Sequence, residues 1–192
     1  MNNNKNNNDV LSNDLHYKNI NKDFFLNDGN GTWISSLTYG EVDYISLIKH
    51  FETYMNHYNI TSFLDIGSGS GKIIVGLANI FDNVDFTGIE ILRDRYDFSQ
   101  QLREKYNVEM NTEFILGSFM DEYIGKYECL YCCNTIFSRE DNTKLYNKIL
   151  NEFLGVAFLF EYDDSLKPYL IDTIKVKTSW CKYVDVNVFY IT

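Results

Sequence analysis

The sequence predicts an α/β fold whose doubly wound sheet is mostly parallel and ends in an antiparallel C-terminal hairpin. Apolar runs of strand length alternate along the chain with segments whose apolar residues recur at helical spacing. One of these strands passes into a helix through three closely spaced glycines, within residues 62–72. Two further strand-like segments follow each other near the C-terminus with no helix between them, as in a hairpin.

The elements follow in the order that such a sheet requires. Apolar residues at three- and four-residue spacing predict a first helix within 40–58. Apolar runs predict strands at 62–67, 85–91, 112–117, 129–134 and 155–162. Helical spacing between them predicts helices at 71–81, 93–106 and 139–153. The last two strands, 173–180 and 184–192, are close enough to pair with each other.

The 192 residues suffice for one domain with its own core. Residues 1–30 are polar and begin Met-Asn-Asn-Asn-Lys, so we expect a low-complexity, flexible segment before a folded domain at 31–192. A short helix or lid at 11–26 is the alternative for part of that segment. No apolar run reaches the roughly 20 residues that span a bilayer, and the N-terminus lacks the apolar core of a secretion signal. We therefore expect an intracellular protein, nuclear or cytoplasmic, with no membrane partner.

Charge limits which partners the chain can bind, and the cysteine spacing bears on whether it holds a metal ion. The net charge of −10 argues against strong direct binding to nucleic acid, which needs a basic surface, and is compatible with a basic protein partner. Cys129 and Cys132 have the spacing of half a zinc site, but they fall in an apolar strand and no second half follows. We expect reduced thiols and no metal site.

The most informative segment is Ser62-Phe-Leu-Asp-Ile-Gly-Ser-Gly-Ser-Gly-Lys72. The glycines at 67, 69 and 71 let the chain turn sharply, and free N–H groups at the following helix start face a bound ligand. Asp65 lies just before the first of these glycines. A carboxylate there would repel a pyrophosphate but would suit a ligand with an ammonium group, such as S-adenosylmethionine.

A second carboxylate supports that ligand. Glu90 ends the next predicted strand, where a carboxylate can accept both hydroxyls of a ribose. The alternative is that Asp65 is a helix cap and Glu90 a solvated strand end. Together, the glycine turn and the two acidic residues predict the Rossmann-like fold of class I methyltransferases, with S-adenosyl-L-methionine as cofactor.

Four segments link the chain to one family: Thr38-Tyr-Gly-Glu-Val42; Phe63-Leu-Asp-Ile-Gly-Ser-Gly-Ser-Gly71 with Gly88-Ile-Glu90; Asn134-Thr-Ile-Phe137; and Ser179-Trp180. Over residues 37–192 the chain resembles the catalytic domain of the histone H3 core-lysine methyltransferases of the disruptor-of-telomeric-silencing family. The resemblance implies lysine methylation by a class I fold instead of a SET domain. It implies a basic protein substrate, such as histone H3 or another chromatin protein.

The resemblance also implies residues of the cofactor site. Tyr39 and Glu41 would shape the methionine end of the cofactor. Ser68 would belong to the glycine turn that approaches it. Ser118 would accept a hydrogen bond from the adenine amine, and Phe119 would pack in the core or stack on the adenine.

Two catalytic residues follow from the same resemblance. Asn134 would orient the attacking amine or the nearby cofactor through its amide oxygen, and Trp180 would form a wall of the lysine channel. A narrow apolar channel lowers the pKa of the amine, so no strong general base is required. The alternatives are that Asn134 only caps the loop and that Trp180 belongs to the core of the hairpin.

Four departures from the family pattern leave other functions open. Cys133 replaces the first of two asparagines, Ser118 replaces an aspartate, and Lys72 replaces a glutamine. The family's hairpin tyrosine falls near Asn187 or Val188. The alternatives are a methyltransferase acting on RNA or a small molecule, and a cofactor-binding homologue with weak or no catalysis.

Overall fold

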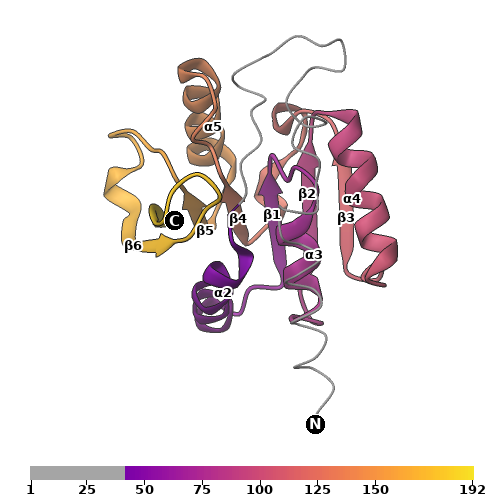
Figure 1. Ribbon diagram of the computed structural model, residues 1–192. Helices are drawn as coiled ribbons and strands as arrows, with labels where there is room; N and C mark the ends of the chain where they lie inside the picture. The colour runs from indigo at the N-terminus through magenta and orange to yellow at the C-terminus, as the bar shows by residue number, and fades with distance from the viewer. Residues whose placement is uncertain (1–41) are drawn as a thin grey trace.

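A seven-stranded sheet organises the computed structural model, which describes residues 42–192 apart from the side chain of Tyr44. The strand order is β3-β2-β1-β4-β5-β7-β6, and Figure 1 shows β3 and β6 on opposite edges. The parallel strands are β1 (Ser62–Ile66), β2 (Asp85–Glu90), β3 (Thr112–Leu116), β4 (Cys129–Cys132) and β5 (Gly155–Leu159). Strands β6 (Leu170–Val176) and β7 (Val184–Ile191) form the antiparallel hairpin. The predicted fold class is confirmed.

Helices cover both faces of the sheet, each over its own apolar core. One core joins α2 (Tyr44–Tyr58), α3 (Lys72–Ala78) and α4 (Arg93–Lys105) to the sheet. The other lies under α5 (Arg139–Glu152) and the short 3-10 helix η5 (Ile124–Lys126). The helix starts follow from local sequence. The side chain of Asp43 accepts the N–H of Ile45 at 3.1 Å to begin α2, and that of Ser138 accepts the N–H of Asp141 at 3.0 Å to begin α5.

The C-terminal hairpin departs from the predicted boundaries. Strand β6 begins at Leu170, directly after the 3-10 helix η6 (Lys167–Tyr169), and ends at Val176. The chain then turns tightly, because the hydroxyl of Thr178 accepts the N–H of Cys181 at 3.0 Å and donates to its carbonyl at 2.9 Å. Trp180 therefore lies in the β6–β7 loop instead of at a strand end.

The strand order reverses between β1 and β4, which lie side by side although two strands separate them in the chain. Open α/β sheets bind ligands at such a switch point, beyond the carboxyl ends of the strands. Within residues 42–192, no helix has the length and apolar character that a membrane crossing requires. The segment predicted to be flexible, 1–30, and the start of the predicted domain, 31–41, lie outside the described residues.

Candidate functional site

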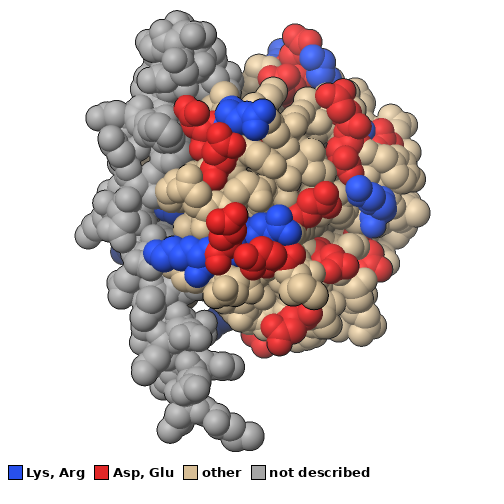
Figure 2. Space-filling view, turned by 90° about the vertical axis from the view of Figure 1, so that its right-hand side faces the viewer, with Lys and Arg blue, Asp and Glu red and all other residues tan. Residues whose placement is uncertain are grey.

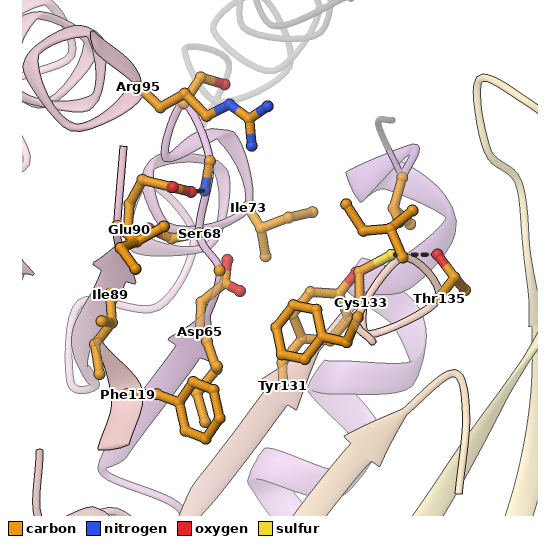
Figure 3. A pocket seen from close by; sticks show the side chains of 18 of the residues that line it. Asp65, Ser68, Ile73, Ile89, Glu90, Arg95, Phe119, Tyr131, Cys133 and Thr135 are labelled. Carbon is orange, nitrogen blue, oxygen red and sulfur yellow. Dashed lines mark hydrogen bonds between the residues drawn. The ribbon is translucent and has the colours of Figure 1, made fainter. Parts of the chain in front are cut away.

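A cavity of about 800 Å³ opens at the carboxyl ends of β1, β2 and β4. Figure 3 shows that side chains from these three strands and from the loops after them surround it. The volume suits one ligand of the size of a nucleoside with a side chain. The switch point of the sheet is therefore the candidate binding site of this chain.

The glycine turn forms one wall of this cavity. Gly67 and Gly71 have φ angles of +77° and +78°, which residues with a Cβ rarely adopt. A Cβ on Gly71 would also lie 2.6 Å from the ring of Phe114. The backbone N–H groups of Gly67 and Ser68 both donate to the carbonyl of Ile89 at 2.9 Å, which ties the turn to β2. Gly67, Ser68 and Gly69 line the cavity, whereas the lining does not include Gly71, which supports the turn through close packing.

Glu90 joins the two loops on this side of the cavity. One carboxylate oxygen accepts the N–H of Gly69 at 2.8 Å, and the other accepts the N–H of Leu92 at 2.9 Å. With 4% of its surface exposed, Glu90 is not a solvated strand end. Each oxygen keeps a further lone pair, so the carboxylate can still accept hydroxyl groups of a ligand.

Asp65 lies on the floor of the same cavity, with 2% of its surface exposed. Burial, and secondarily the charge of Glu90, raise the pKa of its carboxyl group well above the usual range. A cation that entered the cavity would offset both effects. The structure thus brings the two predicted carboxylates together around one ligand-sized space.

The loop after β3 closes the cavity on the other side of β2. Ser118 and Phe119 both line it. The hydroxyl of Ser118 accepts the N–H of Met120 at 3.2 Å, and the ring of Phe119 stacks on Phe137 with 6.1 Å between centroids. The other predicted cofactor residues, Tyr39 and Glu41, lie outside the described part of the chain.

The side chain of Asn134 does not line the cavity but lies behind the residues that do. It has no exposed surface, and its amide oxygen accepts the N–H groups of Phe160 and Glu161 at 3.1 and 3.0 Å. Its amide nitrogen donates to the Asn142 side chain at 2.6 Å, to the Glu161 carbonyl at 2.9 Å and to the Tyr146 hydroxyl at 3.3 Å. These bonds fasten the end of β4 to α5 and to the end of β5. A direct contact with the reacting amine stays a prediction.

Cys133, the residue before Asn134, lines the cavity instead, and so does Trp180. Burial raises the pKa of the Cys133 thiol to about 12, so the thiol is neutral. Trp180 is 45% exposed, with its ring centroid 6.5 Å from that of Phe160, so it is not enclosed in the hairpin core. Among residues 42–192, no three His, Cys, Asp or Glu side chains are grouped to hold a metal ion.

The cavity lining also includes residues to which the sequence assigned no role, among them Arg95 and Tyr131. Tyr131 sits in an apolar strand and reads as a core residue. Its position directly across from Asp65 in the β1–β4 pair was the available signal.

The residues present fit S-adenosylmethionine. The hydroxyls of Ser68 and Tyr131 are buried and have no hydrogen-bond partner among the described residues, although both side chains line the cavity. Buried polar groups are nearly always bonded, so both hydroxyls indicate a polar ligand. The carboxylates of Asp65 and Glu90 match the ammonium and the ribose that this cofactor carries.

Comparison with known proteins gives one family and one fold. The family model described as histone methylation protein DOT1 matches residues 30–153. Magnesium protoporphyrin IX methyltransferase from Synechocystis PCC 6803, solved with bound S-adenosylmethionine, is 15% identical with a TM-score of 0.64, over 92% of this chain and 98% of that one. An RNA methyltransferase from Salinibacter ruber, solved with S-adenosyl-L-homocysteine, is 16% identical with a TM-score of 0.59, over 74% and 90%. No curated protein sequence matches the chain.

Proposed function

The chain belongs to the family of the histone methylation protein DOT1, and from this membership we propose that it methylates a lysine of a basic protein, such as histone H3 or another chromatin protein. It is a methyltransferase of the S-adenosyl-L-methionine-dependent class. The match of the family model, which includes the glycine turn, Glu90 and the segment after β4, is the observation that carries the lysine proposal.

Each part of the cavity has a task in this proposal. S-adenosyl-L-methionine supplies a methyl group activated by a positively charged sulfur. Asp65 would hold the ammonium group and Glu90 the ribose. Ser118 and Phe119, which line the cavity from the loop after β3, would contact the adenine.

The chain's own work is to position a neutral amine and to exclude water. Trp180, Phe137 and Cys133 form a largely apolar wall, and desolvation there lowers the pKa of an entering lysine. The Cys133 thiol, with a pKa of about 12, adds no charge and does not compete as a nucleophile. Asn134 acts as a positioning residue, because it holds the loop that carries Cys133 and Phe137.

The positive charge of Lys72 allows a test of whether this residue repels the positively charged sulfur of the cofactor. It is the first residue of α3, is buried and lines the cavity. S-adenosylmethionine carries a positive sulfur and S-adenosylhomocysteine a neutral one. We expect Lys72→Gln to raise the affinity for the first relative to the second by about three- to tenfold, because a like charge is removed. Calorimetric titration of both ligands gives the ratio, with Lys175→Gln on the exposed surface of β6 as control. An unchanged ratio would show that Lys72 does not sense the sulfur.

A basic protein is the expected partner because the chain carries a net charge of −10. Figure 2 shows acidic and basic side chains interspersed on the face with α4 and β3, the acidic ones covering more of it. We expect transfer to a basic protein to slow as salt rises from about 0.05 to 0.5 M, because salt screens the attraction. Initial rates at saturating cofactor measure this effect. A rate independent of salt, or tight binding to naked DNA, would contradict the charge argument.

Labelled S-adenosylmethionine offered with free histones, with nucleosomes and with bulk RNA tests the proposal. Label on a lysine, located by mass spectrometry, supports it. Label on RNA alone would identify an RNA methyltransferase. Tight cofactor binding with no transfer to any acceptor would identify a cofactor-binding homologue.

A further inference from the structure

The hydroxyl of Tyr131 is a buried polar group without an assigned role. Tyr131 has 2% of its surface exposed and lines the cavity. Its hydroxyl has no hydrogen-bond partner among residues 42–192. A phenylalanine would serve packing alone at lower cost, since a buried hydroxyl without a partner is unfavourable. The unbonded hydroxyl at the cavity therefore indicates that a ligand binds there.

The sheet places Tyr131 beside Asp65. The two residues are paired in the register of β1 and β4, and paired residues of parallel strands direct their side chains to the same face. The next residue in this row, on β2, is Gly88, where a Cβ would lie 2.7 Å from the Ser68 hydroxyl. Asp65 thus has Tyr131 on one side and, on the other, a glycine whose missing side chain leaves room for Phe114 and the Ser68 hydroxyl. Figure 3 shows Asp65 and Tyr131 around the same cavity.

We propose that Tyr131 is a second ligand of the ammonium group of the cofactor, with its hydroxyl oxygen accepting one N–H while the carboxylate of Asp65 accepts another. An ammonium group has three N–H donors, so one carboxylate does not satisfy it. The proposal rests on the assignment of Asp65 to this group and is independent of the substrate protein.

The electrostatic surroundings suit this role. Burial, and then the neighbouring Cys133 and Asp65, raise the pKa of Tyr131 well above its usual range. The phenol therefore stays neutral. It contributes an acceptor without a second negative charge next to Asp65, whose carboxyl group already has Glu90 nearby.

The test compares Tyr131→Phe with the unchanged protein in calorimetric titrations of three ligands. S-adenosylmethionine and S-adenosylhomocysteine carry the ammonium group, and 5′-methylthioadenosine lacks the amino-acid part. We expect both ammonium ligands to bind about 10- to 100-fold more weakly, the scale for a hydrogen bond to a charged group. The affinity for 5′-methylthioadenosine should be unchanged, and the ligand-free variant should unfold at the same or a higher temperature.

Tyr127→Phe is the matched control. Tyr127 lies two residues before β4. Its hydroxyl donates to Glu122 at 3.2 Å, and its side chain packs in the core under α5. This variant should bind all three ligands as before. Unchanged binding of the ammonium ligands to Tyr131→Phe would overturn the proposal, and so would an equal loss for all three ligands. Unchanged binding with slower methyl transfer would assign the hydroxyl to the substrate amine instead. None of these binding results depends on finding the protein acceptor, so a failed lysine proposal would leave them intact.

Discussion

Replacing Asp65 by asparagine is expected to raise the unfolding temperature of the ligand-free protein and to weaken S-adenosylmethionine binding at least tenfold. Asparagine keeps the shape of the side chain and removes a charge that burial and Glu90 make unfavourable. The same charge is what an ammonium ligand requires, and losing a charged hydrogen-bond partner costs about 1.5–3 kcal/mol of binding. Stability and binding should therefore change in opposite directions.

The pH dependence gives this prediction a sign. The folded-state pKa of Asp65 is raised, so between the unfolded value of about 3.9 and the folded value the folded protein holds the extra proton. Stability from this group is present below that window and is lost as the pH rises through it. The advantage of Asp65→Asn should thus grow with pH and then level off. Thermal unfolding between about pH 5 and 8 measures it, with Asp85→Asn at the exposed start of β2 as control. A less stable variant that still binds the cofactor would contradict the assignment.

Replacing Asn134 by alanine is expected to reduce the free energy of unfolding by about 2–4 kcal/mol. The change leaves the buried N–H of Phe160 and the N–H of Glu161 without their acceptor and removes three further bonds. Urea unfolding measures the loss, and Asn147→Ala on the exposed side of α5 should change little. A loss below about 0.5 kcal/mol would show that the network does not hold β4 and β5 together.

A kinetic result separates the structural role of Asn134 from the catalytic one. At a temperature where both proteins are folded, the maximal rate of Asn134→Ala should fall more than the cofactor affinity, because the loop with Cys133 and Phe137 loses its anchor. Asn142→Ala removes one partner from the network and should slow transfer in the same sense, by less. Full activity of Asn134→Ala would rule out both a catalytic and a positioning role.

The two carboxylates assigned to the cofactor could be predicted from the sequence because consecutive strands carry them. Asp65 and Glu90 end neighbouring parallel strands, and the geometry of the sheet then fixes that they meet. The choice between Cys133 and Asn134 could not be made in the same way. Both follow the end of β4, and which one faces the cavity depends on the hydrogen bonds of the loop to α5 and β5.

Residues from distant segments were harder to place. Tyr131 looks like any apolar strand residue until its register with Asp65 is known. Trp180 was expected at a strand end, but the turn between Thr178 and Cys181 moves it into a loop. The first reflects a pairing between strands and the second a local hydroxyl bond, and apolar spacing encodes neither.

The two hydrogen bonds that the Glu90 carboxylate accepts from Gly69 and Leu92 affect what its presence in other family members can show. A carboxylate offers an acceptor to each loop, whereas a glutamine would turn an N–H₂ group toward one of the two donors. A descendant that had lost methyl transfer would still need this glutamate to keep its loops in place. Selection for folding alone would thus preserve it, and its presence in a homologue would be poor evidence that the homologue is an active enzyme. An unpartnered group such as the Tyr131 hydroxyl, which folding does not require, would be the better marker of a retained ligand.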